Sequence, residues 1–301
     1  MSALRGFGGD AAPLAAVLLM VGAGLNLSLL DTTAKYLVTV HGHDPLFLSW
    51  VRFAVHALCV LVLLRGWSNR AVFQVRNVPL QALRGLTVFA TTFFAFLSLR
   101  QLQLAEMISI FFLSPLLITV LSVLVLRERI DPMRWATVLV GFGGVLLIVR
   151  PGHEAFQVGH LHALMAMVSL SVYALLTRHL NASETRESQI FYSGLMPAVI
   201  LLPGLGHFGE MPASAMTGVL VIALGVFGAL SHWLLIRAYV LASPSKLATY
   251  PYLQIVWMTL LGYLVFAQLP DLLTVAGAGI IIASGLALVL FDRWRERRIE
   301  R

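Results

Sequence analysis

Three charged side chains, Asp31, Arg52 and Glu106, stand inside long apolar stretches of the sequence. A charge at the centre of a membrane helix costs at least about 2.5 to 3.5 kcal/mol unless it is paired or hydrated, so such residues mark pathways for substrates or ions. At a rise of about 1.5 Å per residue, the three lie roughly 6 to 10 Å from the same membrane surface. We therefore expect them at similar depth, where they could meet.

The first apolar stretch carries one polar face. Ser28, Asp31 and Lys35 fall on the same side of a helix that turns by about 100° per residue. In one interpretation this face lines a cavity, where Arg52 or Lys35 attracts a carboxylate and either acidic residue, Asp31 or Glu106, holds an amine. In the other, Asp31 and Arg52 form an ion pair that locks two helices together. Both stay open, with Lys35 and Arg52 as gating or ion-pair residues.

Ring-bearing and hydrogen-bonding side chains recur at helical spacing in the later apolar stretches. Rings supply stacking, and hydroxyl or amide tips fix orientation, so this mixture suits a planar or amphipathic solute. The predicted substrate-binding residues are Ser28, Asp31, Thr91, Glu106, Tyr173, His232, Tyr250, Gln254 and Trp257.

Motifs for catalysis or metal binding do not occur in the sequence. There is no HExxH, GxSxG or phosphate-cradling Gly-Lys pattern. His232 has no second His or carboxylate at metal-ligand spacing, so a packed or hydrogen-bonded histidine is the simpler interpretation. The single cysteine, Cys59, permits neither a disulfide nor a Cys-based metal site within one chain. We expect no catalytic residue, no metal and no cofactor.

The composition requires a membrane around these residues. Of the 301 residues, 59% are apolar and 12% are charged, whereas soluble domains carry about 25% charged residues. At about 20 apolar residues per span, ten spans would take about 200 residues and leave about 100 for loops and tails. A soluble enzyme is excluded. We interpret the net charge of +7 as a determinant of membrane orientation and not as a sign of a nucleic-acid partner.

Short clusters of Gly, Pro and charged residues separate the apolar stretches. Pro45, Pro132 and Pro244 fall near helix starts, and Gly66 and Gly152 fall just after helix ends, as terminal preferences favour. The predicted fold is an all-α membrane protein. Its ten transmembrane helices are expected near residues 13–38, 45–65, 78–99, 102–126, 132–150, 157–179, 187–204, 213–239, 244–267 and 271–291.

The basic residues are unevenly divided between the two sides of this helix arrangement. With the N-terminus in the cytoplasm, 17 of the 21 Lys and Arg residues lie on the cytoplasmic side, Arg84 being counted there as a loop residue. Both termini are therefore predicted to be cytoplasmic, in a bacterial inner (plasma) membrane. The stretch that begins near Ala11 is too long for a cleaved signal peptide and is read as the first span. The basic tail, 292–301, is expected on the anionic inner leaflet.

The two halves of the chain resemble each other. VLRERID, from Val125, and VFAQLPD, from Val265, are 140 residues apart in the sequence. Two five-helix repeats, 13–150 and 157–291, follow from this spacing. An odd number of helices per repeat inverts the second half in the membrane, an arrangement typical of alternating access.

Residues 96–152 and 250–271 resemble the EamA-type members of the drug/metabolite transporter superfamily. The resemblance covers nearly the whole chain and includes Ser114-Pro115 in the fourth helix, Glu128 at its end and a Gly-rich fifth helix. The second half departs from the pattern. Ile255 stands where the repeat spacing would put the proline, and Gln268 replaces the glutamate.

The resemblance implies a ten-helix carrier with a central cavity between its halves, which moves small polar metabolites. Our first expectation is export of amino acids, aromatic ones included, because the architecture is similar to bacterial aromatic amino-acid exporters. The alternative is uptake of riboflavin or S-adenosylmethionine, because DTTAKYL and SWVRFAVH look like the branches that carry these solutes. A channel would require rings of one residue type around a pore. The expected partners are a small-molecule substrate and lipid, and Gly-rich faces leave monomer and homodimer open.

Overall fold

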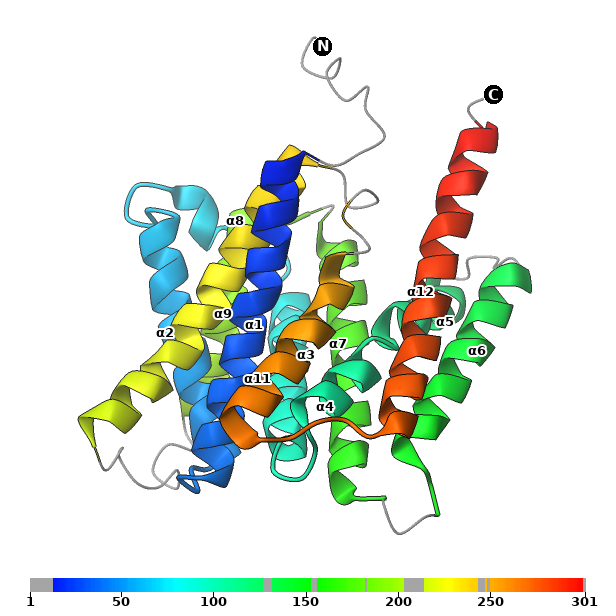
Figure 1. Cartoon of the computed structure of the whole chain (residues 1–301). Helices are drawn as coiled ribbons and strands as arrows, with labels where there is room; N and C mark the ends of the chain where they lie inside the picture. Colours follow the sequence, from blue (N-terminus) through cyan, green and yellow to red (C-terminus); the bar gives the residue numbers. More distant parts are fainter. Residues whose placement is uncertain are drawn as a thin grey trace.

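The computed structural model describes residues 13–126, 132–152, 156–181, 183–202, 214–242, 247 and 250–299. Within these ranges the regular structure is helical, with no β-strand, so the all-α prediction is confirmed. Figure 1 shows a bundle of helices that run between two common ends. We call these the Leu14 end, where α1 begins, and the Asp44 end, where the chain turns from α1 into α2.

The helix bounds agree with the predicted ones to within a few residues except in the fourth, ninth and tenth spans. The elements, with η for a 3-10 helix, are α1 (Leu14–Thr39), α2 (Pro45–Leu63), η1 (Arg70–Phe73), α3 (Val78–Ser98), α4 (Leu104–Phe111), α5 (Ser114–Leu126), α6 (Pro132–Val149), α7 (Val158–Leu180), α8 (Arg186–Leu201), α9 (Ala215–Leu241), η3 (Tyr250–Leu253), α11 (Gln254–Phe266) and α12 (Leu272–Ile299).

Side chains at the helix starts explain several of these bounds. The carboxylate of Asp44 accepts hydrogen bonds from the backbone N–H groups of Leu46 and Phe47, at 2.8 and 3.2 Å. Pro45 takes the first helical position, where its missing N–H costs nothing. Asn77 caps α3 in the same way. Such caps stabilise a helix by about 1 kcal/mol each, so polar residues beside apolar stretches fix where the helices begin.

The fourth span of each half is interrupted, which the sequence did not predict. The predicted helix 102–126 is divided into α4 and α5 at Phe112 and Leu113, directly before Ser114-Pro115. In the second half, η3 with Pro251 precedes α11. Pro removes a backbone donor and clashes with the preceding turn, so it breaks the helix at these points. The rings of Phe112 and Tyr252 lie 5.0 Å apart, so the two interruptions face each other.

Helix packing follows one pattern in both halves. α1 packs against α9 as α7 packs against α3, and α2 packs against α9 as α8 packs against α3. α6 packs against α12, its own counterpart. These pairings are unchanged when the two halves are exchanged.

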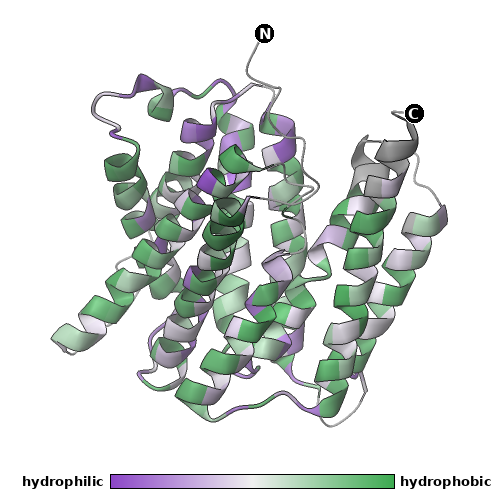
Figure 2. Cartoon of the chain, turned by 45° about the horizontal axis from the view of Figure 1, so that its top comes forward, coloured by the Kyte–Doolittle hydropathy of each residue, from purple (hydrophilic) through white to green (hydrophobic). Residues whose placement is uncertain are grey.

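Hydrophobic residues dominate the helices (Figure 2), and many large apolar side chains on them are exposed. Seven helical segments among the described residues are long and apolar enough to cross a membrane, and two shorter apolar helices, Trp135–Val149 and Tyr250–Phe266, accompany them. Together with α8 they correspond to the predicted spans. The chain is therefore a multi-pass membrane protein.

One residue was assigned wrongly to a loop. Arg84 lies inside α3, nearly two turns from its start, and only 2% of its surface is exposed. It does not belong to the basic loops that set orientation. The uneven division of the other Lys and Arg residues between the two sides does not depend on Arg84.

Candidate functional site

A cavity of about 360 Å³ lies in the middle of the bundle between the two halves. Its volume falls in the range of sites for small metabolites. The interrupted fourth span forms part of its wall. The lining residues used below are Asp31, Arg52, Thr91, Thr92, Phe111, Phe112, Tyr173, His232 and Gln254.

Asp31 and Arg52 face this cavity from α1 and α2, yet they do not pair directly. No ion pair or hydrogen bond to the Asp31 carboxylate is formed by any residue in the described ranges. Arg52 donates to the hydroxyl of Thr92, and its Nε is buried without a partner. An uncompensated buried donor costs roughly 1 to 3 kcal/mol. Both side chains therefore keep hydrogen-bonding capacity for a bound solute.

Tyr173 carries a ring into the cavity and is held from behind by a second arginine. Its hydroxyl lies 3.2 Å from Nη2 of Arg84 and 3.1 Å from the hydroxyl of Ser193. Arg84 also donates to Thr177 and Gln81. No carboxylate in the described part of the chain forms an ion pair with Arg84. This guanidinium therefore leaves a net positive charge beneath the cavity.

His232 also lines the cavity, and it packs against another histidine. Its Nδ1 lies 2.8 Å from the carbonyl oxygen of Gly228, and its ring meets that of His56 edge-on at 5.2 Å. His56 Nε2 is buried without a hydrogen-bond partner. Among the described residues, no three His, Cys, Asp or Glu side chains are placed to hold a metal ion.

The other predicted residues divide between the cavity and the helix interfaces. Thr91 and Gln254 line the cavity. Ser28 is fully buried, and its hydroxyl donates to the carbonyl of Gly24 in its own helix. Tyr250 packs in a separate apolar cluster near the Leu14 end. Trp257 is not among the lining residues, and its indole N–H is buried without a partner.

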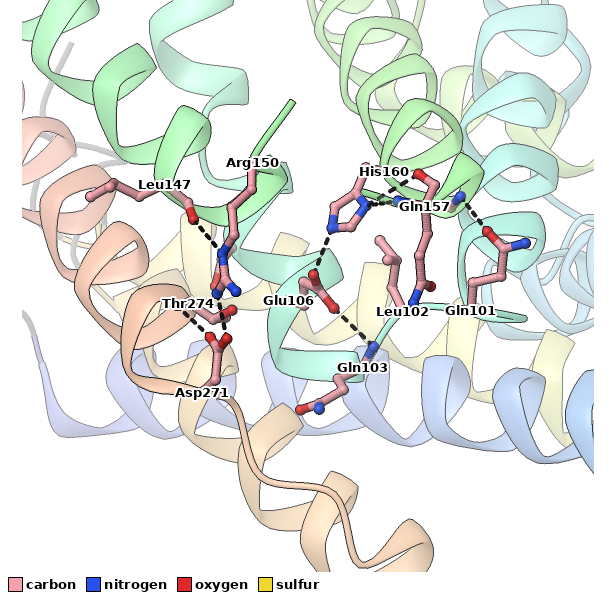
Figure 3. A network of polar contacts seen from close by, with 12 residues as sticks. Gln101, Leu102, Gln103, Glu106, Leu147, Arg150, Gln157, His160, Asp271 and Thr274 are labelled. Carbon is pink, nitrogen blue, oxygen red and sulfur yellow. Dashed lines mark hydrogen bonds and ion pairs between the residues drawn. The ribbon is translucent and has the colours of Figure 1, made fainter. Parts of the chain in front are cut away.

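Glu106 lies away from the central cavity, in a polar network at the Asp44 end (Figure 3). Its Oε1 is 2.7 Å from Nε2 of His160, which joins α4 of the first half to α7 of the second. The Gln101 side chain accepts a hydrogen bond from the N–H of Gly159, again across the halves. The three charges that the sequence placed at similar depth are thus not brought together.

Two further links join the halves at this end. Lys35 donates to the carbonyl of Leu102 and to Oε1 of Gln268, both at 2.7 Å. Arg150 pairs with Asp271. The hydrogen bond from Arg150 lowers the pKa of Asp271 from 3.8 to about 2, and the backbone N–H of Thr274 contributes to the same effect. These bonds have to break before the halves can separate at the Asp44 end.

Sequence reasoning missed Arg84, His56 and Thr92. Arg84 was hidden because three arginines and a short loop precede α3, so it read as an extension of the loop. A helix that starts at the Asn77-Val-Pro signal would have placed it inside the span. Nothing in the sequence marked His56 or Thr92, whose roles arise only from contacts between helices.

The polar and aromatic residues of the site are arranged around one cavity. Charges, hydroxyl groups and rings converge on the cavity, and the polar links lie at one end. A family model described as the EamA-like transporter family matches residues 14–150 and again 157–291. The chain belongs to the EamA-like transporter family. It is a membrane transporter of this family and not an enzyme.

Relatives of this EamA-like protein carry several names. It is 29% identical, over 87% of its length and 89% of the relative's, to an S-adenosylmethionine uptake transporter of Rickettsia bellii. It is 26% identical to a riboflavin transporter of Vibrio cholerae, with 95% of this chain and 96% of that one covered. A pseudopaline exporter of Pseudomonas aeruginosa is also 26% identical and covers 90% of this chain and 95% of its own.

A solved crystal structure has the same fold. It superposes with a TM-score of 0.63 at 21% identity, and the match covers 92% of this chain and 98% of the other. At this identity the likeness concerns the fold alone.

Proposed function

We propose that this protein carries a small metabolite in which an α-amino acid group is joined to a ring system, with S-adenosylmethionine as the first candidate. The observation that supports this best is the pair Asp31 and Arg52, which face one cavity from α1 and α2 without being bonded to each other. An α-amino acid presents an ammonium and a carboxylate, so it complements both groups at once.

The recognition rests on charge-assisted hydrogen bonds. A guanidinium binds a carboxylate through its planar fork, and a carboxylate accepts from an ammonium; such bonds are about twice as strong as neutral ones. Asp31 would hold the ammonium and Arg52 the carboxylate. The positive charge of Arg84 beneath the cavity favours an anionic group on that side. Thr91 and Gln254 supply neutral donors and acceptors.

Rings around the cavity suit the other part of the solute. Tyr173, Phe111 and Phe112 line the wall together with His232. Stacking between aromatic rings contributes about 0.5 to 1.5 kcal/mol beyond the burial of area. S-adenosylmethionine offers an adenine ring at one end and an amino acid at the other. The identity to S-adenosylmethionine uptake transporters over most of both chains supports this choice.

We further propose that transport proceeds by alternating access between two repeats, residues 13–150 and 157–291. The matching packing of the two halves and the two matched family segments support this division. Lys35 and Glu106 then act in a gate at the Asp44 end, because their bonds join one repeat to the other. We assign the Leu14 end, which has arginines in and around η1, to the cytoplasmic side of the inner membrane.

Export of amino acids, aromatic ones included, is the second candidate. The rings in the cavity favour it, since a single aromatic amino acid would use both the charged pair and Tyr173. The relatives bear names of both uptake and export proteins. We therefore expect the solute gradients, and not the fold, to set the direction of net flow.

Counterflow in liposomes tests the proposed substrate class. Liposomes that contain the purified protein and are preloaded with unlabelled S-adenosylmethionine should accumulate the labelled compound, and phenylalanine or tryptophan should compete. Riboflavin, which has a ring system but no amino acid group, should compete weakly. Counterflow of riboflavin without any of S-adenosylmethionine or amino acids would refute the assignment.

A further inference from the structure

A polar pocket and an apolar groove meet at the Asp44 end, outside the central cavity. The pocket has a volume of about 180 Å³ and is lined by Gln103, Glu106, Arg150, Gln157 and Asp271 among others. The groove has a volume of about 600 Å³. Thr274 lines both, and Ala105 in the groove is followed directly by Glu106 in the pocket. The two spaces are therefore adjacent parts of one amphipathic surface.

The groove runs between helices on the membrane face of the bundle. α11 and α12 each pack against α4, so α4 forms its floor and they form its walls. Wall residues such as Val256, Tyr263 and Val275 are more than half exposed. A Cβ built on Gly279, another wall residue, meets no atom within 4 Å, so the space beside it is open. In a membrane this space is filled by something apolar.

The pocket lies where the head of a lipid would be. Asp271 stands one residue before α12, at the boundary of that apolar span. In Figure 3 the Arg150–Asp271 pair and the Glu106 carboxylate lie on opposite sides of the same space. Oε1 of Gln103 is buried there without a hydrogen-bond partner. The pocket thus offers acceptors for an ammonium group beside a guanidinium for an anion.

We propose that this surface binds one phospholipid whose headgroup carries a primary ammonium, with an acyl chain in the groove and the head in the pocket. Glu106 and Gln103 accept from the ammonium, and Arg150 attracts the phosphate. Charge complementarity favours this occupant, since a zwitterionic headgroup brings an ammonium to Glu106 and a phosphate to Arg150 at the same time. The inference is independent of the transported substrate.

Native mass spectrometry of the full-length purified protein tests the proposal. The probes are phosphatidylethanolamine, phosphatidylcholine and phosphatidylglycerol with identical acyl chains. Only the first has a primary ammonium, so it should bind about tenfold more tightly than the other two. Equal binding of all three lipids would overturn the proposal.

Three variants separate the head from the chain. Gly279→Phe fills the groove and should weaken binding of all three lipids, whereas Gly143→Phe is the matched control: Gly143 also has open space around it but lines neither the groove nor the pocket. Glu106→Gln should leave acyl binding intact and abolish the preference for phosphatidylethanolamine. An unchanged preference for phosphatidylethanolamine in Glu106→Gln would contradict a lipid at this site. So would a wild-type protein that is a dimer and becomes a monomer in Gly279→Phe, because a second copy of the chain would then occupy the groove.

Discussion

Nε2 of His160 lies 2.7 Å from Oε1 of Glu106, and this contact joins the second half of the chain to the first at the Asp44 end. The His160 side chain is 2% exposed, whereas that of Glu106 is 18% exposed. The network around them holds further cross-half bonds, made by Lys35 and Arg150. In our account these bonds form one gate, and the central cavity holds the substrate.

Glu106→Gln should change the rate of transport and leave the affinity nearly unchanged. The amide still reaches His160 but forms a weaker bond without its charge, a loss of about 1 kcal/mol. If gate opening limits turnover, exchange should become about fivefold faster. Initial rates and half-saturation concentrations in liposomes measure this. A matching loss of affinity would move Glu106 into the binding site.

Asp31→Asn should remove the response of transport to an imposed pH gradient, if protons drive the carrier. Asp31 reaches the cavity without a bonded partner, so it is free to exchange a proton as well as to hold an ammonium. Glu106→Gln serves as the comparison and should retain the response. An unchanged gradient response in Asp31→Asn would exclude Asp31 as the proton site.

The Arg150–Asp271 link should be insensitive to pH over the physiological range. Because the folded state lowers the pKa of Asp271 to about 2, its stabilisation is complete above the ordinary value and is lost only as the pH falls toward 2. The Asp271 side chain is 53% exposed, so Asp271→Asn should cost less than about 1 kcal/mol. The difference in unfolding temperature between the wild-type protein and Asp271→Asn should be the same from about pH 5 to 8.

A second substitution at Asp271 separates its two roles. Its Oδ1 also accepts from the N–H of Thr274 and caps α12, at 2.8 Å. Asp271→Ala should therefore cost about 1 kcal/mol more than Asp271→Asn, which keeps a capping oxygen. Equal unfolding temperatures for the two variants would exclude the cap as a source of stability.

Tyr173 and Tyr250 should respond differently to loss of their rings. Tyr173→Ala removes a cavity wall and should weaken ring-bearing substrates several-fold, by about 0.5 to 1.5 kcal/mol of stacking. Tyr173→Phe keeps the ring and isolates the hydroxyl that contacts Arg84. Tyr250→Ala should lower stability only, because Tyr250 packs among apolar residues away from the cavity. Competition by aromatic and aliphatic ligands distinguishes the outcomes.

Orientation can be tested by labelling single cysteines in a Cys59→Ser background. Cysteines at Ser68 and Ser183, exposed at the Leu14 end, should react only from the cytoplasm, and one at His41, exposed at the Asp44 end, only from outside. Labelling of Ser183→Cys from outside in intact cells would invert the assignment.

The sequence predicted the helices better than the site. Apolar stretches and terminal Pro, Asp and Asn residues determine helix bounds locally, which is why α1, α2 and α3 lie where they were expected. The depth of Glu106 follows from its position along the chain. The direction of its side chain depends on how α4 is oriented at the break between α4 and α5. Packing therefore brought it to His160 and not to Asp31.

For the same reason, the contacts that residues make between helices could not be predicted from a single sequence. Tyr250 shares a helical face with Gln254 in an uninterrupted helix, but the 3-10 turn at Pro251 rotates one relative to the other. Gln254 lines the cavity, and Tyr250 packs elsewhere. Periodicity gives the correct face only where the helix is continuous.

Discrimination between S-adenosylmethionine and its decarboxylated analogue tests the central claim most directly. In counterflow competition, the wild-type protein should prefer the intact compound by about tenfold, because Arg52 binds the carboxylate. Arg52→Gln should bind both compounds equally, and Asp31→Asn should weaken both while keeping the preference. Equal binding of the two compounds by the wild-type protein, or the same preference in Arg52→Gln, would contradict recognition of an amino acid group by this pair.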